Sequence, residues 1–217
     1  MGAFFTNVQV SIGDRLPEEL RSTIVTALRR FVPSDTFIEV SPDDPTAERM
    51  LVVGPAGPEP WIVVYDSATE GQDEAQLDAL AAALSTPAEG TAVSVLIHDS
   101  DVLELRLWRW GDLLDAYSSC PNYFGPVSRE RQVLLAGQPD RWRDLLLDDV
   151  SPADLRRVWD EPLLFAEATL AQTAQLLGMD PNRCGTGLRY LLHNGADEIT
   201  SWPRYRRFPA RALVGYS

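Results

Sequence analysis

The hydrophobic pattern of this chain changes its period once, near Cys120. Before that point, short segments alternate in character: in residues 3–12, Val8 and Val10 fall on one face and Gln9 on the other. After it, apolar residues recur every three to four positions. Alternation predicts strands, here a half-buried first strand, and the longer period predicts helices. The sequence therefore predicts an α+β protein whose mostly antiparallel sheet precedes a helical C-terminal third.

The same reasoning places the individual elements. Strands are expected at residues 3–12, 36–40, 50–54, 61–66, 91–98, 102–109 and 113–118. Helices are expected from Pro17 to residue 32, after an Asp73 cap, at 128–136 and 139–147, from a Ser151 cap, and at 162–177. A turn between helices is expected at residues 183–187, and the tail from Thr200 is predicted to be irregular because prolines follow at 203 and 209.

Two stretches share one order of elements. Residues 3–54 and 60–118 both read as a strand, a helix and two or three further strands, which predicts a pseudo-duplicated sheet. At the level of topology this resembles the vicinal-oxygen-chelate fold and the duplicated TATA-binding-protein-like or ferredoxin-like sheets, although no motif of these families is present. We expect the α+β part (1–120) and the helical part with its Arg-rich tail (121–217) to pack as one domain, since such short helices need the sheet.

The charge balance excludes several function classes. The 217 residues hold 32 acidic and 19 basic side chains, a net charge of −13, which disfavours nucleic acid and anionic membrane surfaces and favours a basic partner. All the basic residues are arginine. Schiff-base chemistry, a phosphate-binding P-loop and a protein-kinase site all need a lysine, so the sequence argues against each.

Cysteine and histidine are too sparse for a dense ligand set. Cys120 and Cys184 stand far apart, as do His98 and His193, so we expect no metal and no cofactor. No apolar run reaches the length of about 18 residues that spans a membrane, and the N-terminus lacks the features of a signal peptide. A cytoplasmic location is therefore expected.

A first candidate site is the predicted turn that contains His98, Asp99 and Asp101. An imidazole beside two carboxylates suits a cation or acid–base chemistry, whereas Asp and Ser also favour such turns for backbone reasons alone. A second is the loop from Cys120 to Gly125. Cys120 is either a nucleophile approached by His98 or a small hydrophobic residue, with Tyr123 and Phe124 packed over the sheet end.

Two further groups remain open. Trp108 and Trp110 lie opposite the leucines of their strand, and we expect the C-terminal helices to cover them rather than leave an exposed interaction patch. The C-terminal arginines either contact an anion or partner, or wrap the acidic body of the protein itself. These tail residues are Arg204, Arg206, Arg207 and Arg211.

Three classes of function are compatible with these features. A non-catalytic protein-interaction module with an acidic surface ranks first, because charge complementarity speeds association with a basic protein. A small-molecule binding protein of vicinal-oxygen-chelate-like topology ranks second, and an enzyme that uses Cys120 or His98 ranks third. We expect any contact to centre on the Cys120–Gly125 loop and the adjoining sheet end, because a junction of two layers commonly forms a cleft.

Overall fold

The computed structural model describes residues 2–11, 13, 16–32, 37–39, 49–55, 60–86, 90–194 and 204–207. Its strands form one sheet in the order β2-β8-β3-β4-β1-β5-β6-β7, with neighbours antiparallel. The strands are β1 (Phe5–Ser11), β2 (Phe37–Glu39), β3 (Arg49–Val53), β4 (Trp61–Asp66), β5 (Thr91–His98), β6 (Val102–Arg109), β7 (Asp112–Ser118) and β8 (Arg204–Arg207). The predicted α+β class with a mostly antiparallel sheet is confirmed.

The helices separate into two groups along the chain. They are α1 (Pro17–Phe31), α2 (Glu74–Ser85), α3 (Arg129–Leu135), the 3-10 helix η2 (Pro139–Leu145), α4 (Pro152–Asp160), α5 (Ala166–Leu176), α6 (Pro181–Cys184) and α7 (Leu188–Asn194). Three local differences from expectation stand out. The segment at 139–145 is a 3-10 helix, α5 begins at Ala166 instead of 162, and the tail contributes strand β8 where an irregular segment was expected.

The centre of the sheet has a ferredoxin-like element order. Strands β1, β3, β4 and β5 with helices α1 and α2 make a β-α-β-β-α-β series, in which β4 lies between β3 and β1, and β1 lies between β4 and β5. The two predicted units therefore interleave and neither forms a sheet of its own. The pseudo-duplication, the helical C-terminal third and the division into parts at 1–120 and 121–217 stay predictions.

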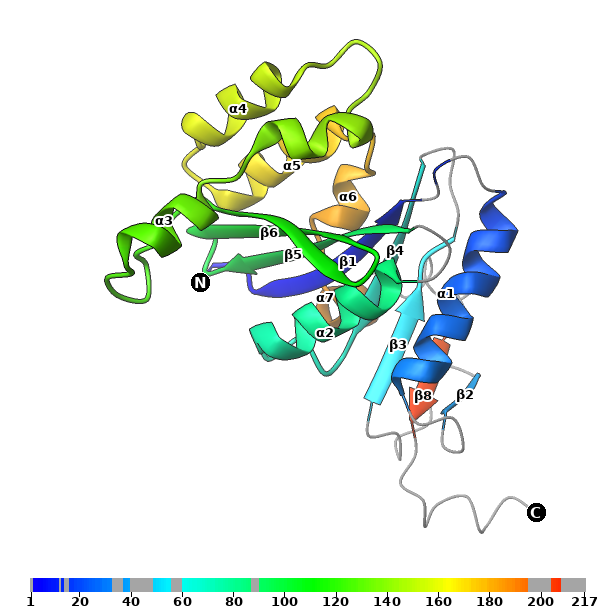
Figure 1. Ribbon diagram of the computed structural model, residues 1–217. Coiled ribbons are helices and arrows are strands. Elements are labelled where there is room, and N and C mark those ends of the chain that lie inside the picture. The colour runs from blue at the N-terminus through cyan, green and yellow to red at the C-terminus, as the bar shows by residue number, and fades with distance from the viewer. Residues whose placement is uncertain are drawn as a thin grey trace, which may run out of the picture.

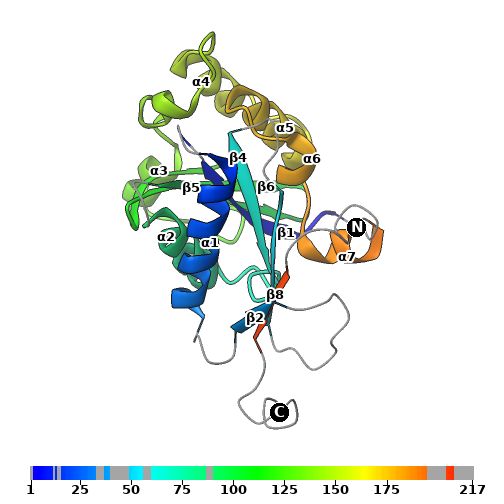
Figure 2. The same cartoon turned by 90° about the vertical axis from the view of Figure 1, so that its right-hand side faces the viewer.

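Helices cover both faces of the sheet. Figure 2 shows α1 and α2 on one side and α5, α6 and α7 on the other. On the first face, Val8 of the sheet belongs to one buried cluster with Ile24 of α1 and Leu80 of α2. On the second face, Val95 of the sheet belongs to another cluster with Leu170 of α5. A sheet covered on both faces buries nearly every side chain of its central strands.

The expectation of a half-buried first strand is wrong for this reason. β1 is a central strand, and its polar residues Asn7 and Gln9 are as buried as its valines. Their side-chain amides form hydrogen bonds inside the protein: Gln9 Nε2 donates to Asn7 Oδ1 at 2.8 Å, and Asn7 Nδ2 donates to the carbonyls of Cys184 at 2.8 Å and Thr186 at 3.0 Å. In β1 the alternation therefore separates two faces that are covered by different layers, and it does not separate a solvent-exposed face from a buried one.

A ring stack anchors the C-terminal helices to the sheet. The rings of Tyr117 on β7 and Trp159 on α4 are stacked at 4.4 Å, and Trp142 on η2 meets Trp159 edge-on at 5.4 Å. Trp142 is fully buried, and its Nε1 donates to Asp115 Oδ2 at 2.7 Å. Such aromatic pairs add stabilisation beyond the apolar area they bury. The C-terminal helices above the sheet are visible in Figure 1.

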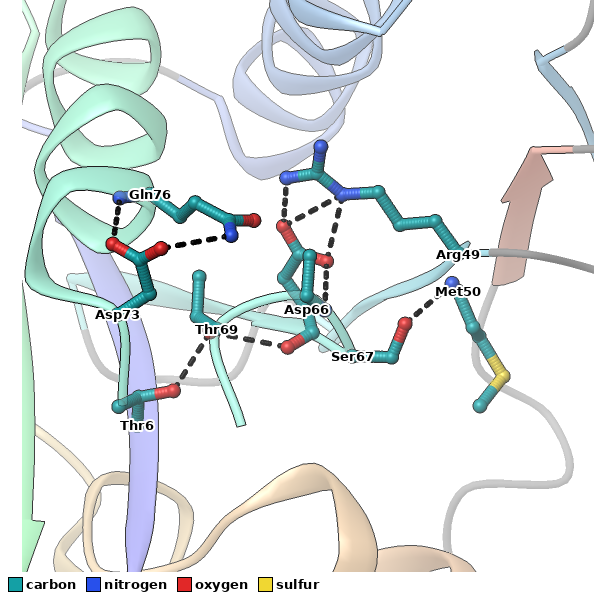
Figure 3. Close-up of polar contacts among 9 residues, drawn as sticks. Thr6, Arg49, Met50, Asp66, Ser67, Thr69, Asp73 and Gln76 are labelled. Carbon is teal, nitrogen blue, oxygen red and sulfur yellow. Dashed lines mark hydrogen bonds and ion pairs between the residues drawn. The ribbon is translucent and has the colours of Figure 1, made fainter. Parts of the chain in front are cut away.

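The connection from β4 to α2 is held by polar contacts at both ends (Figure 3). Asp66, at the end of β4, accepts from Arg49 Nε at 2.9 Å, and the hydroxyls of Thr6 and Thr69 bond at 2.7 Å. Asp73 then accepts from the first turn of α2, as the sequence predicts for a cap. This braced connection carries Glu70, whose carboxylate accepts from Leu188 N–H, and Gln72, which contacts His98.

None of the helices in the described residues is long and apolar enough to cross a lipid bilayer.

Candidate functional site

The turn between β5 and β6 is the point where three parts of the chain meet. Asp99 and Ser100 both have positive φ, at 50° and 59°, which shapes a tight hairpin turn. The N-terminal segment bonds to it, because Ala3 N–H donates to Ser100 Oγ at 2.8 Å. Helix α5 starts on it, because Ala166 N–H donates to the carbonyl of Ser100 at 2.8 Å. The turn is therefore braced on two sides instead of projecting freely.

The N-terminal segment brings a ring beside the histidine that precedes this turn. His98 meets Phe4 at 4.9 Å between ring centroids, Phe124 at 4.8 Å and Tyr123 at 5.5 Å, all edge-on. We call Phe4, His98, Tyr123 and Phe124 the aromatic cluster. Edge-to-face packing is the arrangement that such rings prefer, so the cluster is mutually stabilising.

The tautomer of His98 follows from its partner Gln72. Gln72 Nε2 donates to the carbonyl of Ile97, which can only accept, and this sets the orientation of the amide. Gln72 Oε1 is then the atom 2.6 Å from His98 Nδ1, so Nδ1 carries a proton and donates it. The imidazole is oriented by this bond, and its Nε2 is the nitrogen left to face other groups.

The aromatic cluster is open to solvent on its outer side. Phe124 is 68 % exposed, Phe4 49 % and Tyr123 39 %. The residues just before α5 add further apolar side chains beside the same turn, because Phe165 is 58 % exposed and its neighbour Ala166 bonds to Ser100. Large apolar side chains gathered in this way mark interaction sites on proteins.

Carboxylates surround the aromatic cluster. Tyr123 Oη donates to Asp101 Oδ2 at 3.3 Å, and partial desolvation together with the nearby carboxylates of Asp101 and Asp99 raises the pKa of Tyr123. A cavity of about 310 Å³ lies beside His98 and Phe124, and Glu74 and Glu104 also line it. These are the residues that give the site its negative character.

The two cavity carboxylates share one cation. Arg106 donates to Glu104 Oε2 at 2.9 Å and to Asp78 Oδ2 at 2.7 Å, and it also bonds Glu74. Burial raises the pKa of Glu104, and Arg106 opposes that rise. Three carboxylates contact the guanidinium of Arg106, and the charge of Arg131 also acts to lower the pKa of Glu104.

The structure brings together most of the predicted turn and loop residues and separates the rest. His98, Asp101, Tyr123 and Phe124 are in direct contact as described. Cys120 is partly buried, and its carbonyl accepts from Tyr123 N–H at 3.0 Å. No hydrogen bond joins Cys120 to His98 in the described part of the chain, so their predicted pairing as nucleophile and base stays a prediction.

The tryptophans lie elsewhere, and the expected cover is wrong. Trp108 pairs with Ala92, at the far end of the β5–β6 pair from His98, and packs with the residues of α1 and α2. It is the leucines of β6 that face the C-terminal helices. Trp110 sits in the following turn with a φ of 56° and is 63 % exposed. The face of β6 that carries Trp108 therefore belongs to the layer of α1 and α2, whereas the C-terminal helices were expected to cover it.

The described part of the basic tail lies in β8, the second strand from the other edge of the sheet. Arg204, Arg206 and Arg207 belong to β8, whose backbone pairs with both β2 and β3, so the expected irregular tail is wrong for these residues. Arg211 lies outside the described residues. The predicted roles of these arginines stay untested.

Sequence reasoning missed two members of this site. Phe4 falls on an apolar face of the expected first strand, yet in the structure it lies before β1 and is half exposed. Gln72 belongs to no recognisable motif. The one weak signal for Gln72 in the sequence is its position, one residue before the Asp73 helix cap. Its contact with His98 joins residues 26 positions apart, from the connection between β4 and α2 to the end of β5.

Comparison with known proteins adds no assignment. No protein-family model, no curated protein and no solved structure matches this chain. Within the residues that the structure describes, no group of three or more His, Cys, Asp or Glu side chains is placed to hold a metal ion.

Proposed function

We propose that this protein is a protein-interaction module that docks a basic partner on the aromatic cluster. The observation that carries the proposal is the exposure of Phe4, Tyr123 and Phe124 as one contiguous group of rings around His98. Aromatic residues supply large contact area with few rotatable bonds, and they dominate the binding energy of protein interfaces.

Preorganisation supports the proposal. The segment before β1 is tied to the turn by bonds to Asp99 and Ser100, which holds Phe4 in place. Tyr123 is restrained by Asp101, and His98 by Gln72. A surface that is already ordered loses less conformational entropy when a partner binds.

Charge supports a basic partner. The protein carries a net charge of −13, and Asp99, Asp101, Glu74 and Glu104 lie around or beside the rings. An arginine side chain from the partner can lie on the face of an exposed ring while its guanidinium reaches a carboxylate. Opposite charges also steer the encounter, so association should slow as salt rises.

The test compares matched variants for binding to defined peptides. An immobilised library of arginine-containing peptides, with acidic and neutral peptides of equal length, is probed with the wild type, Phe124→Ala and Val133→Ala. Val133 is 63 % exposed on α3 and serves as the apolar control. We expect Phe124→Ala to weaken binding to the best basic peptide by about tenfold or more, as for an interface anchor, and Val133→Ala to leave it unchanged.

Two outcomes would overturn the proposal. One is equal binding by all three proteins, which would reduce the effect to bulk charge. The other is a Phe124→Ala variant that loses binding only because it unfolds. Since Phe124 is mostly exposed, its truncation should change the free energy of unfolding by no more than about 1 kcal/mol, which a urea titration measures.

A further inference from the structure

The cavity of about 310 Å³ beside His98 and Phe124 adjoins the aromatic cluster. Its lining also contains Leu96 of β5, Glu104 of β6 and Glu74 of α2. Ligand sites of about 300–1,000 Å³ are typical for small molecules, so this cavity, at the lower end, has room for a single side chain. A partner that docks on the exposed rings therefore meets a cavity next to them.

The charges of the lining have one sign. Among the described residues that line the cavity, the two charged side chains are both carboxylates, Glu74 and Glu104. The Glu74 side chain is 48 % exposed and that of Glu104 is 13 % exposed. Each uses Oε2 to accept from Arg106, and no residue that the structure describes donates to Oε1 of either. One oxygen of each carboxylate is thus left for an outside donor, which favours a cation over an anion.

The charge of Glu104 is only partly compensated by the arginines around it. Burial raises the pKa of Glu104, and the neighbouring carboxylate of Glu74 adds to the rise. Arg106 and Arg131 oppose the rise without reversing it, and neither is among the residues that line the cavity. A carboxylate in such surroundings is stabilised by a further positive charge that approaches through the cavity.

The spacing of the two carboxylates suits a guanidinium. A single nitrogen, Arg106 Nη2, donates to both Glu74 Oε2 and Glu104 Oε2, in the second case at 2.9 Å. The carboxylates therefore lie close enough together for one planar guanidinium to reach both. Arginine carries five donors in such a fork, whereas the ammonium of lysine is a compact point charge. Leu96 and Phe124 provide apolar surface for the stem of the arginine, and an aromatic ring can also lie over its guanidinium.

We propose that this cavity is the subsite for one arginine side chain of the basic partner. The guanidinium bonds Glu74 and Glu104, and the stem packs on the apolar side chains of Leu96 and Phe124. The inference rests on the proposed function for the source of this arginine, which is a protein. It adds an expectation that the exposed rings do not give by themselves, namely that the cavity prefers arginine to lysine.

The test uses Nα-acetylarginine amide as the probe, because the guanidinium is its only charge. Nα-acetylcitrulline amide keeps the shape without the charge, and Nα-acetyllysine amide keeps the charge without the fork. Each is titrated into the isotope-labelled full chain while the backbone amide signals of Gly71 and Leu96 in the lining are followed by NMR. We expect the arginine probe to bind at least tenfold more tightly than the citrulline probe, as for hydrogen bonds to charged groups, and more tightly than the lysine probe.

Three variants locate the preference. Glu104→Gln keeps an acceptor for Arg106 and removes the charge, so the preference for arginine over citrulline should fall about fivefold, the difference between charged and neutral hydrogen bonds. Glu74→Gln should lower it in the same way, and it replaces Glu104→Gln if a urea titration shows that the latter is unfolded. Glu19→Gln is the matched control and should change nothing, because Glu19 is exposed in the first turn of α1 and does not line the cavity.

Three results would contradict the proposal. They are the absence of any shift of either amide signal with the arginine probe, an affinity for citrulline or lysine equal to that for arginine, and a preference that neither glutamine variant lowers. None of these measurements uses a peptide or a Phe124 variant. If peptides of the library bind through Phe124 in spite of such a result, the docking surface stands and the arginine subsite alone is wrong. If no peptide binds through Phe124 while the arginine probe shows the stated preference, the docking surface is wrong instead.

Discussion

Replacement of Arg106 by methionine should destabilise the fold strongly at neutral pH. The Arg106 side chain is only 8 % exposed, and it faces Glu104, Asp78 and Glu74, whose side chains are 13 %, 30 % and 48 % exposed. Methionine keeps the apolar stem but removes the cation. The three carboxylates would then face one another without a positive charge between them, the situation in which breaking a buried pair is most costly.

The size of the destabilisation depends on how far each carboxylate can turn into solvent once Arg106 is removed. Loss of one partner from a fully buried pair costs about 3–5 kcal/mol. Glu74 can turn outward and Asp78 partly so, whereas Glu104 remains enclosed. We therefore expect the lower end, about 3 kcal/mol, which corresponds to a fall in Tm of roughly 6–12 °C for a chain of this size.

The cost of Arg106→Met should also depend on pH. Burial and the Glu74 carboxylate raise the pKa of Glu104, and Arg106 lowers it, so removal of Arg106 raises this pKa further. An acid whose pKa is higher in the folded state holds more protons when folded, so the free energy of unfolding falls as pH rises through that interval. The deficit of the variant should therefore be smaller near pH 4.5 than at pH 7.

Urea titration followed by tryptophan fluorescence at both pH values measures this deficit, with the slope m unchanged if the change is one of stability alone. Arg143→Met is the matched control, because Arg143 is 63 % exposed and bonds an exposed Asp140. It should change the free energy of unfolding by no more than about 0.5 kcal/mol. A deficit for Arg106→Met below about 1 kcal/mol at pH 7, or one that does not vary with pH, would refute the reasoning.

Two other predictions concern the connection from α6 to α7, which packs against β1. Gly187→Ala should lower the free energy of unfolding by about 1–3 kcal/mol, because its Cβ would clash with Phe5, and a thermal melt that matches the wild type would contradict this. Burial raises the pKa of Glu70, so its contribution makes the free energy of unfolding decline as pH rises from the ordinary range of a glutamate through the folded pKa. Glu70→Gln should remove that part of the decline in urea titrations between pH 4 and 8, and an unchanged slope would count against the assignment.

The local elements could be predicted from the sequence because each depends on neighbours in the chain. The expected bounds of β4, β5 and β6 agree with the structure, and the predicted caps Asp73 and Ser151 both accept from the first turns of their helices. Side-chain alternation, helical spacing and capping are set by backbone geometry over a few residues. A single sequence carries that information directly.

The candidate site could be predicted in part for the same reason. His98 and Asp101 flank one turn, and Tyr123 and Phe124 follow the last strand of the β5–β6–β7 meander, so hairpin geometry brings them to one end of the sheet. Hairpins connect strands that are adjacent in both sequence and space. Phe4 could not be found in this way, because it joins the group only through the pairing of β1 with β5.

Strand order and the covering of the two faces were decided by tertiary structure. The same alternation can occur in an edge strand with one solvent-exposed face and in the central strand β1. In β1, Asn7 is buried and bonds to Cys184 and Thr186, which lie 177 and 179 positions further along the chain. β8 enters the sheet between β2 and β3 although its sequence is rich in arginine and flanked by prolines. The arrangement that forms depends on which distant surfaces can be buried together and on which buried polar groups find partners. Local periodicity carries no information about either of these long-range conditions.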